Sequence, residues 1–263
     1  MPSNGKARVP TLEEKEFMFE QITKHRHPEK NRAIMEVSFK LGLRVQEISL
    51  LQIKEVAELF GEPGSVNRDF ALKKIMTVPA MYTKGSGATK RSQKDYKRTS
   101  VTFKVQEFDA VINQIKELVA AGVDFEPSRF YPKVKKRKGK SRDLPLVDES
   151  LIDALNQHIK VRLDSDPYLK PTSPLFVSQK GGAYSPNNLQ EHMALMLRKW
   201  AHIEKARSHS GRRDLATDVI HKQKKPLSVA QALLGHVQPS TTVTYTQPSE
   251  QELSEALIGL EKK

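Results

Sequence analysis

The spacing of apolar and polar residues predicts helices at the N-terminal end of the chain. Thr11 is followed three positions later by Glu14, the pattern of a capping box, so a helix is expected over about residues 11–24. Pro28 opens a second helix and Gly42 is placed to end it. The apolar face of this second helix consists of Ile34, Val37 and Leu41.

Three further helices follow from the same periodicity. One has its apolar face within residues 108–118 and ends at Gly122, one covers residues 148–162, and one starts at Ser185 with a proline at its first position. Phe108, Val111, Ile112, Ile115 and Leu118 repeat at helical spacing in the first of these helices. Leu151, Leu155 and Ile159 are expected to face inward in the second, and the third is lined by Leu189, Met193, Met196, Leu197 and Trp200, whose methionines and tryptophan are interpreted as core.

Short strands are expected between these helices. Residues 73–82 are rich in strand formers, and Pro79 places this strand at a sheet edge. Residues 101–105 alternate apolar and polar side chains, and residues 175–177 form a short apolar run. A turn over residues 83–87, with two glycines, closes the first strand.

Composition narrows the classes of function. The 263 residues include 44 Lys and Arg against 31 Asp and Glu, a net charge of +13, which favours a polyanionic partner such as nucleic acid. Cysteine is absent, so disulfides and thiolate metal sites are excluded. No apolar run is long enough to span a bilayer and no signal segment opens the chain, so we expect a cytoplasmic protein without a membrane partner.

One C-terminal stretch carries the candidate chemistry. His209 and Arg212 are three residues apart, His236 follows a glycine after an apolar run, and Tyr245 lies nine positions after His236. A hydroxyl nucleophile, two imidazoles and a fixed positive charge suit attack on a phosphodiester, because a guanidinium binds phosphate oxygens and opposes the charge that grows in the transition state.

This stretch resembles the C-terminal signature of the tyrosine recombinases, the phage-integrase family: H-x-x-R, then L-G-H, then a tyrosine. Residues 41–48, Leu-Gly-Leu-Arg-Val-Gln-Glu-Ile, are similar to the family's other signature. The resemblance implies that Tyr245 is the nucleophile, that Arg44 and Arg212 bind the scissile phosphate, and that His209 and His236 bond to it or assist proton transfer. It implies an α+β, mostly helical catalytic domain with a small antiparallel sheet. Glu47 is expected to hold its helix or Arg44.

The family places a catalytic lysine beside the turn of a β-hairpin that follows the first arginine, and Lys84 matches that place. Residues 140–146 resemble the return strand of this hairpin, which makes residues 86–138 an insertion. The alternative takes residues 133–146 as the whole hairpin, with Lys136 or Lys138 as the catalytic lysine. A general acid is the role implied for this lysine.

Basic residues outside the predicted helices are candidates for phosphate contacts. The run at 133–142 lies inside the domain, which favours a DNA-binding role over a nuclear signal. The expected DNA-binding residues are Lys136, Arg137, Lys138, Lys140 and Lys180. No cofactor and no metal site is expected, because the histidines lack supporting carboxylate or thiolate spacing. Four histidines are interpreted as structural: His158, His192, His202 and His221.

The expected domain organisation is a disordered N-terminus over residues 1–10 and a catalytic domain over 11–263, without a separate N-terminal core-binding domain. The insertion or an accessory DNA-binding protein would then complete the DNA clamp. The expected partner is double-stranded DNA, bound by a homo-oligomer, a tetramer, that the C-terminal tail helps to link. The function implied is site-specific recombination by a prokaryotic, phage or mobile-element protein. The alternatives are a type IB topoisomerase-like enzyme and a DNA-binding regulator without catalysis.

Overall fold

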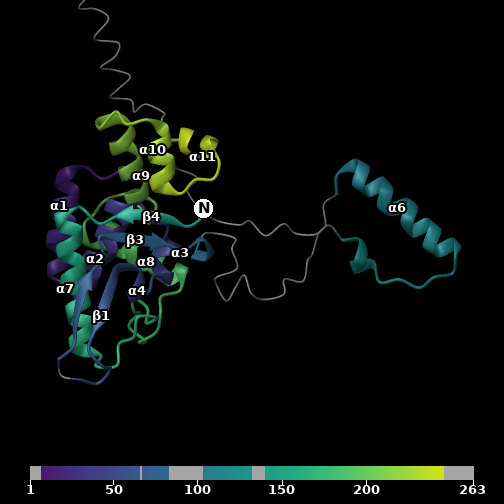
Figure 1. The fold of residues 1–263 in the computed structure, drawn as a ribbon. Coiled ribbons are helices and arrows are strands. Elements are labelled where there is room, and N and C mark those ends of the chain that lie inside the picture. Colours follow the sequence, from purple (N-terminus) through teal and green to yellow (C-terminus); the bar gives the residue numbers. More distant parts are fainter. Residues whose placement is uncertain (1–6, 66, 83–102, 132–139, 246–263) are drawn as a thin grey trace, which may run out of the picture. The chain divides into compact units, whose positions relative to one another are not determined.

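The computed structural model describes residues 7–65, 67–82, 103–131 and 140–245 (Figure 1). The chain forms two compact units, one made of residues 1–84 with 139–263 and the other of residues 85–138. Each unit is described by itself. Among the described residues, every helix is too short or too polar to cross a membrane.

The first two helices begin and end where the sequence predicts. Helix α1 (Leu12–Thr23) has the capping box, with reciprocal bonds between Thr11 and Glu14. Helix α2 (Pro28–Leu41) starts at its proline and ends at Gly42, which has a left-handed φ of +58°. Both predicted helices are therefore confirmed.

Helix α2 is the centre of the larger unit and is buried on nearly all sides, including several polar positions. It packs against α7 (Glu149–Ser165) and α9 (Ser210–Thr217). The remaining helical elements of this unit are α3 (Val45–Leu50), α4 (Ile53–Val56), η1 (Ala80–Tyr82), α8 (Pro186–Leu195), η3 (Met196–Trp200), η4 (Asp218–Lys222), α10 (Leu227–Leu234) and α11 (Pro239–Val243).

Two antiparallel pairs of four-residue strands complete the unit. Strands β1 (Ala57–Phe60) and β2 (Asp69–Leu72) form a ribbon that the sequence analysis did not anticipate. Strand β3 (Ile75–Val78) pairs with β4 (Arg142–Pro145), with Val78 opposite Arg142 and Met76 opposite Leu144. The return strand expected over residues 140–146 therefore pairs with the strand expected over 73–82. That strand is shorter than expected, because it ends at Val78 before Pro79 and residues 80–82 form the 3-10 turn η1.

The hydrophobic core lies entirely in the larger unit and joins α1, α2, α7, α8 and the β3–β4 pair. All the core positions expected in α2, α7 and α8 are buried, and Trp200 packs at the edge. The described residues thus make a mostly helical α+β unit, which confirms the expected fold class.

The smaller unit contains helix α6 (Val105–Ala120) and the 3-10 turn η2 (Pro127–Phe130). None of its described residues, 103–131, is buried. The strand expected over residues 101–105 is wrong where it can be examined, because Val105 already belongs to α6 and residues 103–104 are not in a strand. A glutamate at position 107 caps this helix at Lys104, a signal that outweighs three alternating residues.

One other expectation needs correction. Residues 175–177 do not form a strand, because only isolated bridges at Pro174 and Val177 flank the buried side chains of this segment. Near the N-terminus, the Ala7 carbonyl accepts a bond from Arg213, and Arg8 pairs with Glu14 at 2.8 Å.

Candidate active site

The buried carboxylate of Glu47 is the centre of the candidate site. Arg44 is the N-cap of α3, and Glu47 one turn later bonds back to both the backbone N–H of Arg44 (2.8 Å) and its guanidinium (2.9 Å). The Glu47 side chain is 0% exposed, whereas the Arg44 side chain is 24% exposed. The expectation that Glu47 holds its helix or Arg44 is confirmed, since it does both.

A second arginine binds the same carboxylate. Arg142 of β4 donates from Nη1 to Oε1 (3.1 Å) and from Nη2 to Oε2 (2.8 Å) of Glu47. Burial by itself raises the pKa of Glu47. The hydrogen bonds and charge of Arg142, together with Arg44, outweigh burial and hold that pKa below its usual value. Glu47 is therefore an anion that two arginines share.

Arg212 of α9 is buried, with 2% exposure, and reaches the ends of two other helices. Its Nη1 donates to the Gly42 carbonyl (2.6 Å) after α2, and its Nη2 donates to the Leu234 carbonyl at the end of α10. Burial and then the charge of Arg44 lower the pKa of Arg212 to about 10, so this guanidinium is still charged at neutral pH.

His236 comes directly after Gly235, the left-handed cap of α10. Its side chain is buried, and Nδ1 lies 2.8 Å from the Thr242 hydroxyl. Burial, followed by the charges of Arg212, Arg44 and Arg142, lowers the pKa of His236 to about 4. The imidazole is therefore neutral at neutral pH.

Tyr245 stacks beside His236, with ring centroids 6.0 Å apart and planes 14° from parallel. The tyrosine is partly exposed, and its backbone is held at both polar groups: its N–H donates to Thr242 and its carbonyl lies 3.0 Å from Nε2 of His221. The Tyr245 side chain lies within electrostatic range of the Arg212 guanidinium. The nucleophile candidate is thus fixed by its main chain beside a neutral imidazole and a cation.

The other predicted site residues are less enclosed or cannot be described. His209 is the N-cap of α9 and is exposed, so it does not share the buried environment of Arg212. Lys140 and Lys180 are exposed near the start of β4 and in a turn. Lys84, Lys136, Arg137 and Lys138 lie outside the described residues.

His221 has the structural role interpreted for it, since its Nε2 lies 3.0 Å from the Tyr245 backbone carbonyl. One residue of the site, Arg142, was missed: it lies in the segment expected to form the return strand and was assigned no part in the site. A signal for it existed: it precedes the core residue Leu144 by two, so the strand period turns both toward the same face.

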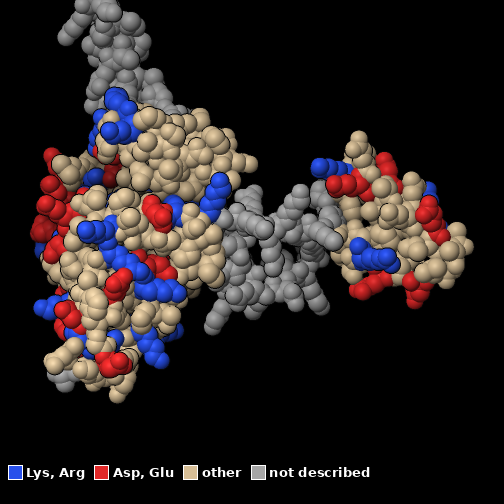
Figure 2. Space-filling model, in the orientation of Figure 1, with Lys and Arg blue, Asp and Glu red and all other residues tan. Residues whose placement is uncertain are grey.

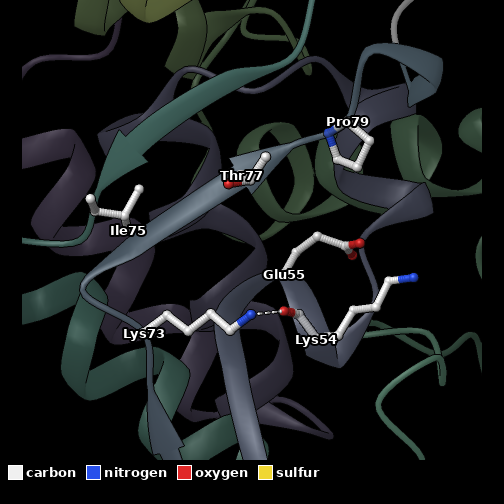
Figure 3. A pocket seen from close by; sticks show the side chains of 6 residues that line it. All are labelled: Lys54, Glu55, Lys73, Ile75, Thr77 and Pro79. Atoms are coloured by element: carbon white, nitrogen blue, oxygen red, sulfur yellow. Dashed lines mark hydrogen bonds between the residues drawn. The ribbon is translucent and has the colours of Figure 1, made fainter.

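The described surface offers two other features, neither of them part of this site. Thr77 and five neighbours line a hollow (Figure 3) on the face of β3 opposite its buried Met76 and Val78; the lining is Lys54, Glu55, Lys73, Ile75, Thr77 and Pro79. Figure 2 shows lysine and arginine interspersed with acidic side chains over the larger unit.

Within the described residues, no group of three or more His, Asp or Glu could hold a metal ion.

Comparisons with known proteins point in one direction. A model of the phage integrase family matches residues 112–252. The tyrosine recombinase XerC of Methylobacterium sp. (strain 4-46) is 37% identical over 91 residues, which is 34% of this chain and 28% of that protein. XerC of Methylobacterium nodulans is 36% identical over 88 residues, 34% of this chain and 27% of that protein. The matches thus span little more than a quarter of these relatives.

Solved structures share the fold across nearly the whole chain. XerA recombinase superposes with a TM-score of 0.58 at 17% identity, covering 98% of this chain and 65% of that one. XerH site-specific recombinase bound to its difH substrate gives a TM-score of 0.53 at 20% identity, covering 96% of this chain and 55% of that one.

Proposed function

The chain belongs to the phage integrase family, and from this premise we propose that it is a site-specific DNA recombinase that works through a covalent 3′-phosphotyrosyl intermediate. The observation that carries the proposal is the gathering of Arg44, Arg212, His236 and Tyr245 from distant parts of the chain into one electrostatically connected cluster. The relatives' names supply the reaction class, and the cluster supplies groups able to carry it out.

Each group has a defined part in the proposed reaction. The Tyr245 oxygen attacks the scissile phosphorus, a P–O bond to tyrosine forms, and the P–O bond to the 5′-carbon side breaks. Arg44 and Arg212 bind the non-bridging oxygens and oppose the charge that develops there. His236, neutral at the pH of the reaction, can hydrogen-bond the phosphate or accept a proton, and His209 assists from its exposed position.

The leaving 5′-oxygen takes its proton from a lysine, and Lys84 is the proposed general acid. The pairing of β3 with β4 supports this choice, because residues 142–145 pair with residues 75–78 and not with residues of 133–146, as the alternative with Lys136 or Lys138 requires. Since the phosphotyrosyl bond retains the energy of the broken ester, attack by a 5′-hydroxyl of another strand rejoins DNA without ATP.

Double-stranded DNA is the proposed substrate. The XerH structure contains the difH substrate, and a Tn1549 transposon integrase with the same fold was solved with transposon right end DNA. Lys140 and Lys180 are proposed phosphate contacts, with Lys136, Arg137 and Lys138 in the neighbouring basic run. A tetramer on DNA remains part of the proposal, as does an accessory protein that completes the clamp.

A covalent-trapping experiment tests the proposal. The protein is incubated with duplexes covering the DNA that flanks its gene, nicked beside candidate sites so that the cleaved end diffuses away, and denatured before electrophoresis. We expect a DNA-linked protein band with wild type and none with Tyr245→Phe. Tyr168→Phe, a change at an exposed tyrosine of the same unit, is the matched control and keeps the band.

The outcomes separate the alternatives. DNA binding without an adduct on any duplex would favour the regulator without catalysis. If the nicked duplexes give an adduct but intact duplexes are only cut and resealed, with no product joined to a second duplex, the topoisomerase-like enzyme is favoured. An adduct that persists in Tyr245→Phe would show that another residue is the nucleophile.

A further inference from the structure

Arg142 is a buried arginine in the candidate site to which the proposed reaction assigns no part. Its side chain is only 8% exposed. It stands opposite Val78 in the β3–β4 pair and, like Val78 and Leu144, points to the inner face of this pair. Both of its terminal nitrogens bond to Glu47, and its buried Nε has no partner within the described structure.

The hydrogen bonds of Glu47 link the position of Arg44 to that of Arg142. Glu47 accepts four bonds on two oxygens, two from Arg142 and two from Arg44. A fully buried carboxylate bound in this way has one favourable orientation, because the bidentate fork fixes both oxygens at once. The Arg44 guanidinium, partly exposed and therefore accessible to a phosphate, takes its position from that carboxylate.

We propose that Arg142 is a positioning residue that fixes Arg44 for the scissile phosphate by holding Glu47 in a bidentate pair, an inference that rests on the proposed function. Arg142 does not bind phosphate itself, since both terminal nitrogens are committed to Glu47. Its two bonds to Glu47 join strand β4 to helix α3, which begins after Arg44.

The net charge of the site is consistent with a positioning role for Arg142. Arg44, Arg142 and Arg212 surround the single carboxylate of Glu47, which leaves two positive charges at the site. The transition state of phosphoryl transfer carries about one more negative charge than a phosphodiester monoanion on its equatorial oxygens, so this surplus matches the transition state more closely than the ground state.

A substitution at Gly235 displaces the Arg142 side chain without changing Arg142 itself. A Cβ at Gly235 would lie 2.7 Å from Nη1 and 3.0 Å from Cδ of Arg142, so any larger residue pushes the guanidinium off Glu47. The φ of Gly235 is +59°, so alanine also strains the backbone. Gly122, with a φ of +63° and nothing within 4 Å of an added Cβ, is the matched control for that strain alone.

The main test compares Arg142→Lys with Arg68→Lys. Arg68 also donates from both terminal nitrogens, to the Pro167 and Leu169 carbonyls, and also has an unpartnered buried Nε, but it contacts no residue of the site. Single-turnover cleavage of a nicked duplex, DNA affinity and urea unfolding are measured for each. We expect Arg142→Lys to slow cleavage by about tenfold to a hundredfold, the effect of a misplaced group, with DNA affinity within about threefold of wild type, whereas Arg68→Lys cleaves at the wild-type rate.

A second variant distinguishes positioning from general damage. If Arg142 acts through Arg44, then Arg142→Lys has little further effect in an Arg44→Lys background, because coupled residues are not additive. A full multiplicative loss in that background would overturn the proposal, and so would wild-type cleavage by Arg142→Lys. If Arg142→Lys does not fold, Gly235→Ala supplies the test: slower cleavage than Gly122→Ala supports the proposal and equal cleavage overturns it. Absence of an adduct with wild type counts against the proposed function instead.

Discussion

The Arg212 guanidinium bonds to carbonyls where two helices end, Gly42 after α2 and Leu234 at the end of α10. Free carbonyls at a helix C-terminus carry partial negative charge, so both helices stabilise the buried cation without any carboxylate of its own. The arginine is also held by two fixed backbone points, which sets the plane of its fork.

Replacing Arg212 by lysine tests the importance of the planar guanidinium and its two bonds to backbone carbonyls. An ammonium keeps the charge but cannot hold two fixed carbonyls in one plane while facing a phosphate. We expect Arg212→Lys to lower the single-turnover cleavage rate on the order of a hundredfold. Arg213→Lys, one position along the same helix and bonded to Ala7, should cleave normally; comparable rates for the two variants would contradict the reasoning.

At this scale the sequence predicted which residues gather but not how each is held. Arg44, Arg212, His236 and Tyr245 were expected together and lie together, while their catalytic roles remain predictions. Arg142 and the contact from His221 were missed because they depend on strand register and on the path of the chain after α10. The different exposure of His209 and Arg212 follows from where α9 begins, which a three-residue spacing does not reveal.

Among the elements, α2 and α9 approach each other unusually closely at Gly211. A Cβ there would lie 2.6 Å from Oγ of Ser38 and 2.8 Å from its carbonyl carbon, so backbone as well as side chain would have to move. Since α9 carries Arg212, this packing also sets the position of the arginine.

Gly211→Ala is therefore expected to destabilise the fold, although alanine is usually the more stabilising residue inside a helix. Helix propensity alone favours alanine by about 1 kcal/mol, but overpacking against the α2 backbone should destabilise the fold by about 1–3 kcal/mol. Urea unfolding measures the difference. Gly182→Ala, with open space around the added Cβ, is the control and should change stability little. A stabilised Gly211→Ala would show that α2 and α9 separate easily.

Removing residues 85–138 tests whether the larger unit folds by itself. Its core contains no residue of that segment, and β3 and β4 already pair on either side of it. With a short Gly/Ser linker in its place, we expect cooperative thermal unfolding, followed by circular dichroism, at a temperature close to that of the full chain. Non-cooperative unfolding or aggregation would mean that the smaller unit covers part of the larger one.

Helix ends were the most predictable elements, because caps and glycines act locally. The capping box at Thr11, the left-handed Gly42 and the Ser185 cap of α8 were all read from the sequence. Four-residue strands were not, since a pattern that short does not separate the β1–β2 ribbon from a loop. Whether 86–138 is an insertion relative to the family stays a prediction.

For the whole molecule, two buried histidines and one half-buried histidine make stability depend on pH. Burial is the main cause that lowers the pKa of His158, His192 and His236 to about 4 each. Between pH 6.5 and 4 the unfolded chain binds protons that the folded chain does not, so acidification favours unfolding. Glu36 and Glu55 have the opposite effect on stability, because burial raises their pKa values. As the pH falls through these raised pKa values, the folded chain binds protons that the unfolded chain does not, and this favours the folded state.

We expect the free energy of unfolding to fall as the pH is lowered from about 6.5 to 5.5, by up to about 4 kcal/mol per pH unit if three protons are taken up. Urea titrations across this range measure the slope. His158→Gln should lower this slope by the contribution of one proton, about 1.4 kcal/mol per pH unit. A flat or rising stability over the same range would contradict the three lowered pKa values.

The net charge of +13 predicts DNA binding that weakens steeply with salt. If Lys140 and Lys180 each contact a phosphate, alanine at either position should reduce the slope of log affinity against log salt by about one. Fluorescence anisotropy over a series of salt concentrations gives the slopes. Lys24, paired with Glu20 on α1, is the control lysine; an equal change for Lys24→Ala would point to a nonspecific charge effect.

The pairing of Val78 with Arg142 also bears on the order of folding. Sixty-three residues lie between these two partners. During synthesis the ribosome must therefore produce the whole smaller unit before β4 can join β3 and before Arg142 can reach Glu47. Closing so long a segment costs more entropy than closing a tight hairpin, and compaction of residues 85–138 shortens the effective loop. The contacts of Arg142 and Arg44 with Glu47 are thus expected to form late, after α1, α2 and α3 have formed, so a nascent chain lacks the complete candidate site.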